Sequence, residues 1–207
     1  MPWDREGDFV NTKYAYVCHA ELNAILNNKG SVLENAGIAY VNNYVDPGTA
    51  CDLAVDCCDN AKKRAKLKSN LINGEPGNWI DFQLYFDDNF NDVDMLRNNS
   101  KSMDGAYDLT LRPYVLDLQF KNHPCYYKNF EKLLNIVLND KSLEISREEI
   151  LYAIKQGKYD FDILKRIVLS NGKLNKKIFS DSLVKAPDDG NYVNTLYDVF
   201  EYCGVYV

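Results

Sequence analysis

The chain has 207 residues, of which 46% are hydrophobic and 26% charged, and its formal net charge is -6. No apolar run approaches the roughly 20 residues that a membrane-spanning helix needs, and the acidic balance disfavours a broad groove for a long nucleic acid. The six cysteines and an amino terminus unlike a secretory leader favour reduced thiols in the cytoplasm. The composition therefore predicts a globular cytoplasmic protein with one domain and an appendage.

The segment 14–27, YAYVCHAELNAILN, predicts an amphipathic helix. Leu22, Ile25 and Leu26 recur at helical spacing on one apolar face. Many of the other residues are good helix formers, and Gly30 makes a plausible stop.

His19 and Glu21 lie two residues apart within this segment. In zinc deaminases of nucleobases, a His or Cys at the start of a helix binds Zn²⁺, and a Glu two residues later moves protons without binding the metal. The spacing is therefore typical of a deaminase motif. The alternative is that His19 is an ordinary histidine of an amphipathic helix.

The residues around this pair resemble the deoxycytidylate (dCMP) deaminase family in its eukaryotic form. The resemblance extends over about residues 2–40, and the matching positions are Pro2, Trp3, 5–7, 12–14, 17 and 19–25. It implies zinc-dependent hydrolysis of dCMP to dUMP, with His19 as a zinc ligand, Glu21 as the proton shuttle and Asn23 near the nucleotide. It also implies a hydrolase with an α/β fold, shortened at its amino terminus.

The next elements are predicted to be a strand over 37–45 and a helix over about 50–68, with Thr49 as a candidate N-cap. Alternation of polar and apolar residues over 79–86 predicts a half-buried strand. The segment 87–105 reads as a loop, and Pro113 either restricts the extended segment 106–120 to a sheet edge or divides it into two strands.

The region from 126 onward is predicted to be helical. Ser146 and Glu149 have the spacing of a capping box, and the predicted helices are 129–139, 146–156, 161–170, 174–184 and 192–203. Two Leu-Tyr pairs, Leu151-Tyr152 and Leu196-Tyr197, give this region a fainter resemblance to degenerate ankyrin repeats. Helix hairpins unrelated to ankyrin are the alternative.

The second zinc motif of the family, Pro-Cys-x-x-Cys, has no counterpart, because the sequence contains no Cys-x-x-Cys. Cys51, near the start of a predicted helix, is the best available second ligand. Cys57 and Cys58 lie about 9 to 10 Å further along that helix, and we expect one of them to be buried and the other partly exposed. His123-Pro124-Cys125 is a rival position for the motif.

Two functions remain open from the sequence. The first is a dCMP deaminase-like enzyme with an incomplete zinc site that acts on a pyrimidine deoxynucleotide. The second is a catalytically inactive relic that binds a protein partner through its helical region. In both cases the predicted fold is α/β: a truncated deaminase-like region with a small mixed sheet over 1–86, a loop and extended segments over 87–125, and a helical region over 126–207.

Overall fold

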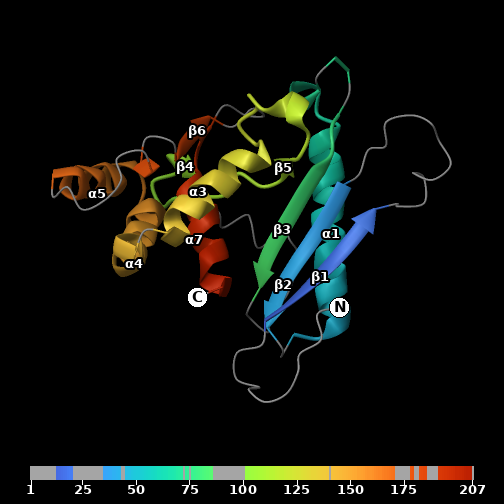
Figure 1. Cartoon of the computed structure of the whole chain (residues 1–207), viewed down its shortest axis with the longest axis horizontal. Helices are drawn as coiled ribbons and strands as arrows, with labels where there is room; N and C mark the ends of the chain where they lie inside the picture. The colour runs from blue at the N-terminus through green and yellow to red at the C-terminus, as the bar shows by residue number, and fades with distance from the viewer. Residues whose placement is uncertain are drawn as a thin grey trace. The chain divides into compact units, whose positions relative to one another are not determined.

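The computed structural model describes two compact units of the chain (Figure 1). The first, 1–96 with 113–117, is here called the sheet unit, and the second, 97–112 with 118–207, the helical unit. The predicted mixture of helices and small mixed sheets is confirmed. The residues described are 13–20 (backbone only), 35–42, 45–71, 73–74, 76–85, 101–139, 141–170, 178–179, 182–185 and 191–206.

A four-stranded sheet in the order β1-β2-β3-β5 forms the centre of the sheet unit. The first and last pairs of neighbouring strands are antiparallel, and the central pair, β2 and β3, is parallel. Helix α1 crosses from β2 to β3 and lies along one face of the sheet (Figure 1). The bounds are Lys13–Ala20 (β1), Asn35–Asn42 (β2), Pro47–Ala65 (α1), Trp79–Tyr85 (β3) and Tyr114–Val115 (β5), with a short 3₁₀ helix at Lys68–Asn70.

The helix predicted over 14–27 is wrong for residues 14–20, which form strand β1. Eight residues of this strand pair with β2, from Lys13 opposite Asn42 to Ala20 opposite Asn35. The segment combines helix formers with aromatic and β-branched residues that suit a strand, and pairing with a neighbour outweighs local helix propensity. Residues 21–27 lie outside the described residues.

Helix α1 begins at Pro47 and not near residue 50. The side chain of Asp46 accepts a hydrogen bond of 3.1 Å from the backbone N–H of Thr49, so Asp46 is the N-cap and the prediction of Thr49 was wrong. Proline suits the first helical position because it lacks an N–H that would go unsatisfied there. Local chemistry therefore sets the start of this helix.

The packing of α1 on the sheet depends on Gly37. A Cβ atom at this position would lie 2.0 Å from the carbonyl oxygen of Ala54 and 2.3 Å from the backbone nitrogen of Cys58. The backbone of α1 therefore rests directly on β2. Cys57 and Cys58 are both buried, which corrects the prediction that one of them would be partly exposed. The core beside them consists of Ala39, Val41, Val45, Ala50, Leu53, Ala54, Cys57 and Tyr85.

Strand β3 was predicted to be half-buried, and this is wrong. Its polar positions Asp81 and Gln83 are buried along with all of its apolar ones except Ile80, and Asp81 lies against Asn60 of α1. Asp81 is satisfied there: its carboxylate accepts hydrogen bonds of 2.8 Å from the side chain of Asn60 and 2.8 Å from the backbone N–H of Phe82.

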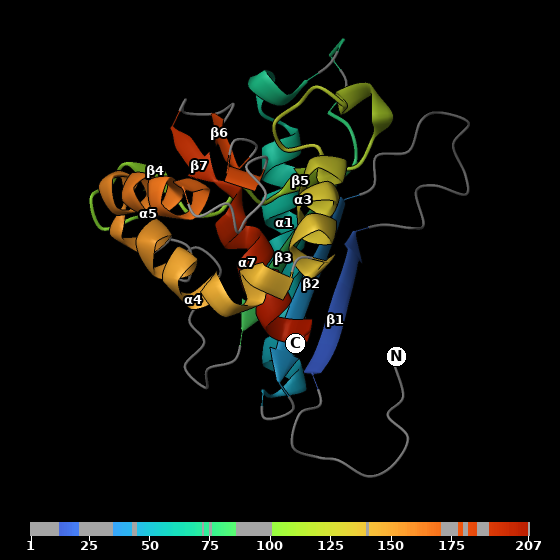
Figure 2. The same ribbon diagram turned by 60° about the vertical axis from the view of Figure 1, so that its left-hand side comes forward.

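The helical unit contains a three-stranded sheet in the order β4-β7-β6 (Figure 2). The extended segment predicted over 106–120 contains two strands, β4 before Pro113 and β5 after it. The first belongs to this three-stranded sheet and the second to the four-stranded sheet. The bounds are Tyr107–Asp108 (β4), Tyr127–Asn139 (α3), Lys141–Gln156 (α4), Lys158–Ser170 (α5), Leu183–Lys185 (β6), Tyr192–Asn194 (β7) and Thr195–Tyr206 (α7), with a 3₁₀ helix at Leu118–Phe120.

Two predictions for this region are corrected. Helix α4 begins at Lys141, so Ser146 lies inside it and does not cap it. Residues 183–184 and 192–194, predicted as helix, lie in β6 and β7, because antiparallel pairing of these two strands satisfies their backbone groups. Of the two Leu-Tyr pairs, the second is more buried: Leu151 is half-buried and Tyr152 is 65% exposed, whereas Leu196 is fully buried and Tyr197 is half-buried.

The turn 102–106 holds the junction between α4 and α5. The backbone N–H of Met103 donates to the carbonyl of Lys155 near the end of α4, and the carboxylate of Asp104 accepts from the backbone N–H of Lys158 at the start of α5. Helix ends leave such groups without intrahelical partners. The turn therefore caps both helices from a distant part of the chain. Of the predicted loop, residues 87–100 lie outside the described residues.

A buried ion pair connects the segment before Pro113 to α7. The guanidinium Nε of Arg112 lies 3.1 Å from Oδ1 of Asp198, and its Nη2 lies 2.5 Å from Oε2 of Glu201. The side chains of Arg112 and Asp198 are 1% and 0% exposed. The other carboxylate oxygen of Asp198 accepts from the backbone N–H of Leu111 at 2.8 Å. These contacts join residues 87 and 89 positions apart in the sequence.

Candidate functional site

Cys51 lies in the first turns of α1 and is exposed. Helix α1 is the next element after β2 in the chain. With the helix starting at Pro47, the segment 47–51 reads Pro-Gly-Thr-Ala-Cys. Gly48 therefore stands in the place of the first cysteine of Pro-Cys-x-x-Cys and Cys51 in the place of the second. In the sequence, Asp46 followed by Pro47 marks the start of this helix. The prediction placed the start near residue 50, three residues too late.

Gly48 offers no ligand, and a side chain at this position would meet Asp46. A Cβ atom at this position would lie 2.8 Å from Oδ2 of Asp46, and the only other neighbouring atom within 4 Å belongs to the same carboxylate. That oxygen is also the one that accepts the N-cap hydrogen bond from the backbone N–H of Thr49. A cysteine at position 48 therefore requires the Asp46 cap to shift.

His19 lies in β1, and the structure describes its backbone position. It pairs with Ala36, next to the amino-terminal end of β2. At about 3.3 Å per residue, the six residues from Ala36 to the end of the strand at Asn42 extend about 20 Å. Helix α1 begins beyond that carboxyl-terminal end.

The register of β1 does not bring His19 and Cys51 together. Among the cysteines whose side chains the structure describes, Cys58 lies at the His19 end of the sheet: its Sγ donates to the carbonyl oxygen of Asn35, the partner of Ala20. Cys51 lies seven residues earlier on α1, about 10 Å away along the helix axis. Zn–S and Zn–N bonds are only about 2.0 to 2.3 Å long, so these residues do not fit a zinc ion in this register.

The remaining predicted site residues, Glu21 and Asn23, lie outside the described residues. Within the part of the chain that the structure does describe, no group of three or more His, Cys, Asp or Glu side chains could hold a metal ion. The same part contains no helix that is long and apolar enough to span a membrane.

The rival position for the second motif, around Cys125, is part of the core of the helical unit. Cys125 is buried, and its Sγ lies 3.9 Å from the carbonyl oxygen of Leu111. Nδ1 of His123 accepts a hydrogen bond of 3.2 Å from the backbone N–H of Cys125. The His123 ring therefore stabilises the turn before α3, which is a structural role.

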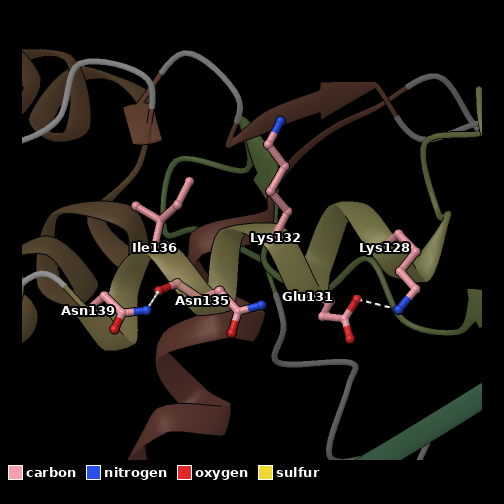
Figure 3. Close-up of a pocket in the computed structure, with 6 residues that line it drawn as sticks. All are labelled: Lys128, Glu131, Lys132, Asn135, Ile136 and Asn139. Atoms are coloured by element: carbon pink, nitrogen blue, oxygen red, sulfur yellow. Dashed lines mark hydrogen bonds and ion pairs between the residues drawn. The ribbon is translucent and has the colours of Figure 1, made fainter.

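A shallow hollow lies along the exposed side of α3 (Figure 3). Two interactions within the helix occupy its polar groups: Lys128 pairs with Glu131 at 2.6 Å, and the side chain of Asn139 donates to the carbonyl of Asn135. The pairing with Glu131 raises the pKa of Lys128, which keeps the ammonium charged. The hollow has lining residues from this one helix only, Lys128, Glu131, Lys132, Asn135, Ile136 and Asn139, and so it does not enclose a ligand.

Two tyrosines in the helical unit, the buried Tyr107 and the half-buried Tyr197, have raised pKa values. Burial, with Asp162 and Asp104 nearby, raises the pKa of Tyr107 to about 12, and burial with Glu201 nearby raises that of Tyr197 to about 12. Neither tyrosine is poised to exchange a proton near neutral pH. The ring of Tyr197 instead lies 5.7 Å from the ammonium of Lys155, as a cation–π contact between α7 and α4.

Comparison with protein-family models gives no match, and comparison with curated proteins gives no similar sequence.

Proposed function

We propose that this chain is a dCMP deaminase-like protein with an incomplete zinc site. The observation that carries the proposal is the start of α1 at Pro47, directly after a strand, with Cys51 exposed in its first turns and Gly48 three residues before it. This supports a second zinc motif that has lost one of its two cysteines. The sequence around His19 and Glu21 supports the first motif, and a pyrimidine deoxynucleotide is the corresponding ligand.

The incomplete motif has a chemical consequence. A catalytic zinc site ordinarily has three protein ligands and one open position, and at most His19 and Cys51 remain here. We therefore expect the wild-type protein to bind zinc weakly and to convert dCMP to dUMP and ammonia at no more than the background rate.

The test is to restore the missing cysteine with Gly48→Cys. Zinc stoichiometry after dialysis and dUMP formation are measured for wild type, Gly48→Cys, and Gly48→Cys combined with His19→Ala. In the described register of β1, His19 lies too far from position 48 to share a zinc ion with it, so neither wild type nor Gly48→Cys is expected to retain zinc. Tight zinc binding in Gly48→Cys that His19→Ala abolishes would show that β1 pairs with β2 in another register. A matched control is Gly74→Cys, which adds an exposed thiol away from α1.

Failure of wild type to bind dCMP, measured by calorimetry with the fold intact by circular dichroism, would overturn the proposed relation to zinc deaminases. Robust dUMP release by the wild type that Glu21→Gln abolishes would overturn the incomplete site, because it would require a full ligand set. Binding of dCMP without turnover, measured by calorimetry, supports the deaminase-like ligand class independently of zinc.

A second function, that of a catalytically inactive protein-interaction module, is favoured by the register of β1. His19 lies beside the amino-terminal end of β2, whereas Cys51 lies in the first turns of α1, which begins beyond the carboxyl-terminal end of β2. On this proposal, Gly48→Cys would remain without zinc, and the helical region would carry the activity of the protein. Partner binding by the full chain distinguishes the two proposals. On the second proposal, substitutions on the surface of residues 126–207 abolish binding of the partner protein, whereas His19→Ala does not.

A further inference from the structure

The connection between α1 and β3 contains an Asn-Gly turn. Asn73 and Gly74 have φ angles of 56° and 83°, and two successive residues with positive φ are typical of a type I′ β-turn. Asparagine and glycine are the residues that adopt such angles at least cost. Both residues are exposed. The turn therefore lies at the surface, where water reaches its side chain and its backbone.

The two groups that could react with each other in this turn are not held by other parts of the chain. Among the described residues, no hydrogen bond is made by the side chain of Asn73 or by the backbone N–H of Gly74. The hydrogen bond that closes a β-turn joins its first and fourth residues, so it does not use the N–H of the third. Apart from its chain neighbours, a Cβ atom on Gly74 would meet nothing within 4 Å. The Gly74 nitrogen is therefore accessible to the side chain before it.

We propose that Asn73 is a site of spontaneous modification, at which the side chain loses its amide and the link to Gly74 becomes a mixture of aspartyl and isoaspartyl bonds. A base removes the proton of the Gly74 N–H, and the nitrogen forms a bond to Cγ of Asn73. The bond between Cγ and the amide nitrogen breaks, and this nitrogen takes up a proton and leaves as ammonia. The product is a five-membered succinimide ring.

Water completes the reaction by opening the ring. Addition of water at Cγ breaks the bond from Cγ to the Gly74 nitrogen and leaves aspartate. Addition at the backbone carbonyl carbon of residue 73 breaks the other bond to that nitrogen, and the chain then continues through Cγ as isoaspartate. The net change consumes one water and releases one ammonia, without oxidation or reduction. This ammonia does not depend on dCMP, so the proposal is independent of the deaminase-like assignment.

Asp104 and Gly105 have the same arrangement of reacting atoms, but their contacts block the reaction. The backbone N–H of Gly105 donates to the carbonyl oxygen of Ser102 at 2.8 Å. The carboxylate of Asp104 accepts from the hydroxyl of Ser102 at 2.7 Å and from the backbone N–H of Lys158 at 2.8 Å. Both reacting groups are thus held in place. We expect no isoaspartate at residue 104.

Asn70 provides an internal reference three residues before Asn73. It is 1% exposed, and its side-chain nitrogen donates to the carbonyl oxygen of Arg64 at 3.0 Å. The residue after it is Leu71, whose side chain hinders attack by its backbone nitrogen. Both asparagines lie in the tryptic peptide 69–97. Their rates of amide loss can therefore be compared within one peptide.

Incubation of the full chain in mildly alkaline buffer, followed by trypsin digestion and tandem mass spectrometry, tests the proposal. The peptide 69–97 should gain the mass difference between a hydroxyl and an amino group at residue 73, with Asn70 unchanged. A sample taken at zero time corrects for loss during digestion. The rate should rise in proportion to the hydroxide concentration, because the attacking nitrogen must first lose its proton.

Two further measurements identify the product. Each modified molecule carries one negative charge more than the formal net charge of -6, so it should elute later from an anion exchanger. A protein isoaspartyl methyltransferase, which transfers a methyl group to isoaspartyl carboxylates, should label residue 73 and leave residue 104 unlabelled. Labelling at residue 104 at the same rate would contradict the protection by Ser102 and Lys158.

Substitutions in the turn separate the reaction from general instability. Asn73→Gln should lower amide loss at this position to the rate of Asn70, because the longer side chain would have to form a six-membered ring. Gly74→Asn should also slow the reaction, since it places a Cβ beside the attacking nitrogen while tolerating the positive φ. Circular dichroism should show the same fold in both variants.

A synthetic peptide of residues 69–80 gives the rate of the sequence without the fold. Amide loss at Asn73 in the folded chain should be as fast as in this peptide. An Asn73 amide that persists in the folded chain while the peptide loses its own would overturn the proposal. Loss at Asn70 as fast as at Asn73 would also overturn it, because it would show that unfolded molecules react and that the turn has no special reactivity.

Discussion

The carboxylate of Asp104 accepts a hydrogen bond of 2.8 Å from the backbone N–H of Lys158, across 54 positions of sequence. Lys158 is the first residue of α5, and the residue before it, Gly157, cannot cap the helix with a side chain. A Cβ atom on Gly157 would lie 2.0 Å from Cγ of Asp104, and its φ of +129° also favours glycine. The cap of α5 is therefore supplied by the turn 102–106.

Asp104→Ala should lower the free energy of unfolding by about 1 kcal/mol, which is typical for loss of a helix cap. Urea denaturation at low protein concentration measures this. Asp160→Ala is the matched control, because Asp160 is an exposed carboxylate in the first turn of the same helix. An equal loss in both variants would mean that charge near the helix end, and not the hydrogen bond, is responsible.

The same residue should make stability depend on pH. Hydrogen bonds from the Ser102 hydroxyl and then from the backbone N–H of Ala106 lower the pKa of Asp104 below 3.8. A carboxyl whose pKa is lower in the folded state stabilises the fold above its unfolded pKa, and this contribution is lost as the pH falls through the folded pKa. Unfolding free energies at pH 5 and pH 3 should thus differ less in Asp104→Asn than in wild type. An unchanged difference would contradict the assignment.

Gly37→Ala should destabilise the sheet unit by about 3 kcal/mol, since the added methyl group meets backbone atoms of α1 that cannot turn aside. Gly74→Asn is the control: nothing lies within 4 Å of that position, and asparagine tolerates its positive φ. Thermal unfolding followed by circular dichroism compares the two. Equal melting temperatures for Gly37→Ala and wild type would show that α1 does not rest on β2 at this point.

Asp198→Asn should cost about 3 kcal/mol, because it removes the fully buried one of the two carboxylates that pair with the guanidinium of Arg112 and leaves only Glu201. The acceptor for the N–H of Leu111 survives in this variant, so the change isolates the charge. A double-mutant cycle with Arg112→Met should show a coupling free energy, the double variant losing less than the sum of the single ones. Glu131→Gln, in the exposed pair with Lys128, should leave the unfolding free energy nearly unchanged.

Cys51 should be the thiol that alkylates fastest among the five cysteines whose side chains the structure describes, since it is exposed and the other four are buried. Burial also raises the pKa of Cys203, which lowers its thiolate fraction further. Peptide mapping after a short native treatment with iodoacetamide measures the order, with Cys51→Ser as the control. Rapid labelling of Cys58 would contradict its burial against β2.

Sequence alone predicted the elements whose signals are local. Alternation predicted a strand over 79–86, and the structure has it over 79–85; turn chemistry predicted a helix over about 50–68, and the structure has it over 47–65. Of the two roles predicted for Pro113, the structure shows the division of 106–120 into two strands. The candidate site was predicted only as residue types: His19, Glu21 and Cys51 at certain spacings. Their distances could not be predicted, because they depend on how strands pair.

Tertiary structure decided the features that depend on residues far apart in the chain. Residues 14–20 form a strand because β2 supplies partners for their backbone groups, although the segment contains good helix formers. Asp81 is buried and hydrogen-bonded because α1 lies over it and supplies Asn60, and Asp104 caps α5 because a turn more than fifty residues away reaches its first N–H. Periodicity and capping act within a few residues, whereas pairing, burial and long-range hydrogen bonds depend on the whole chain.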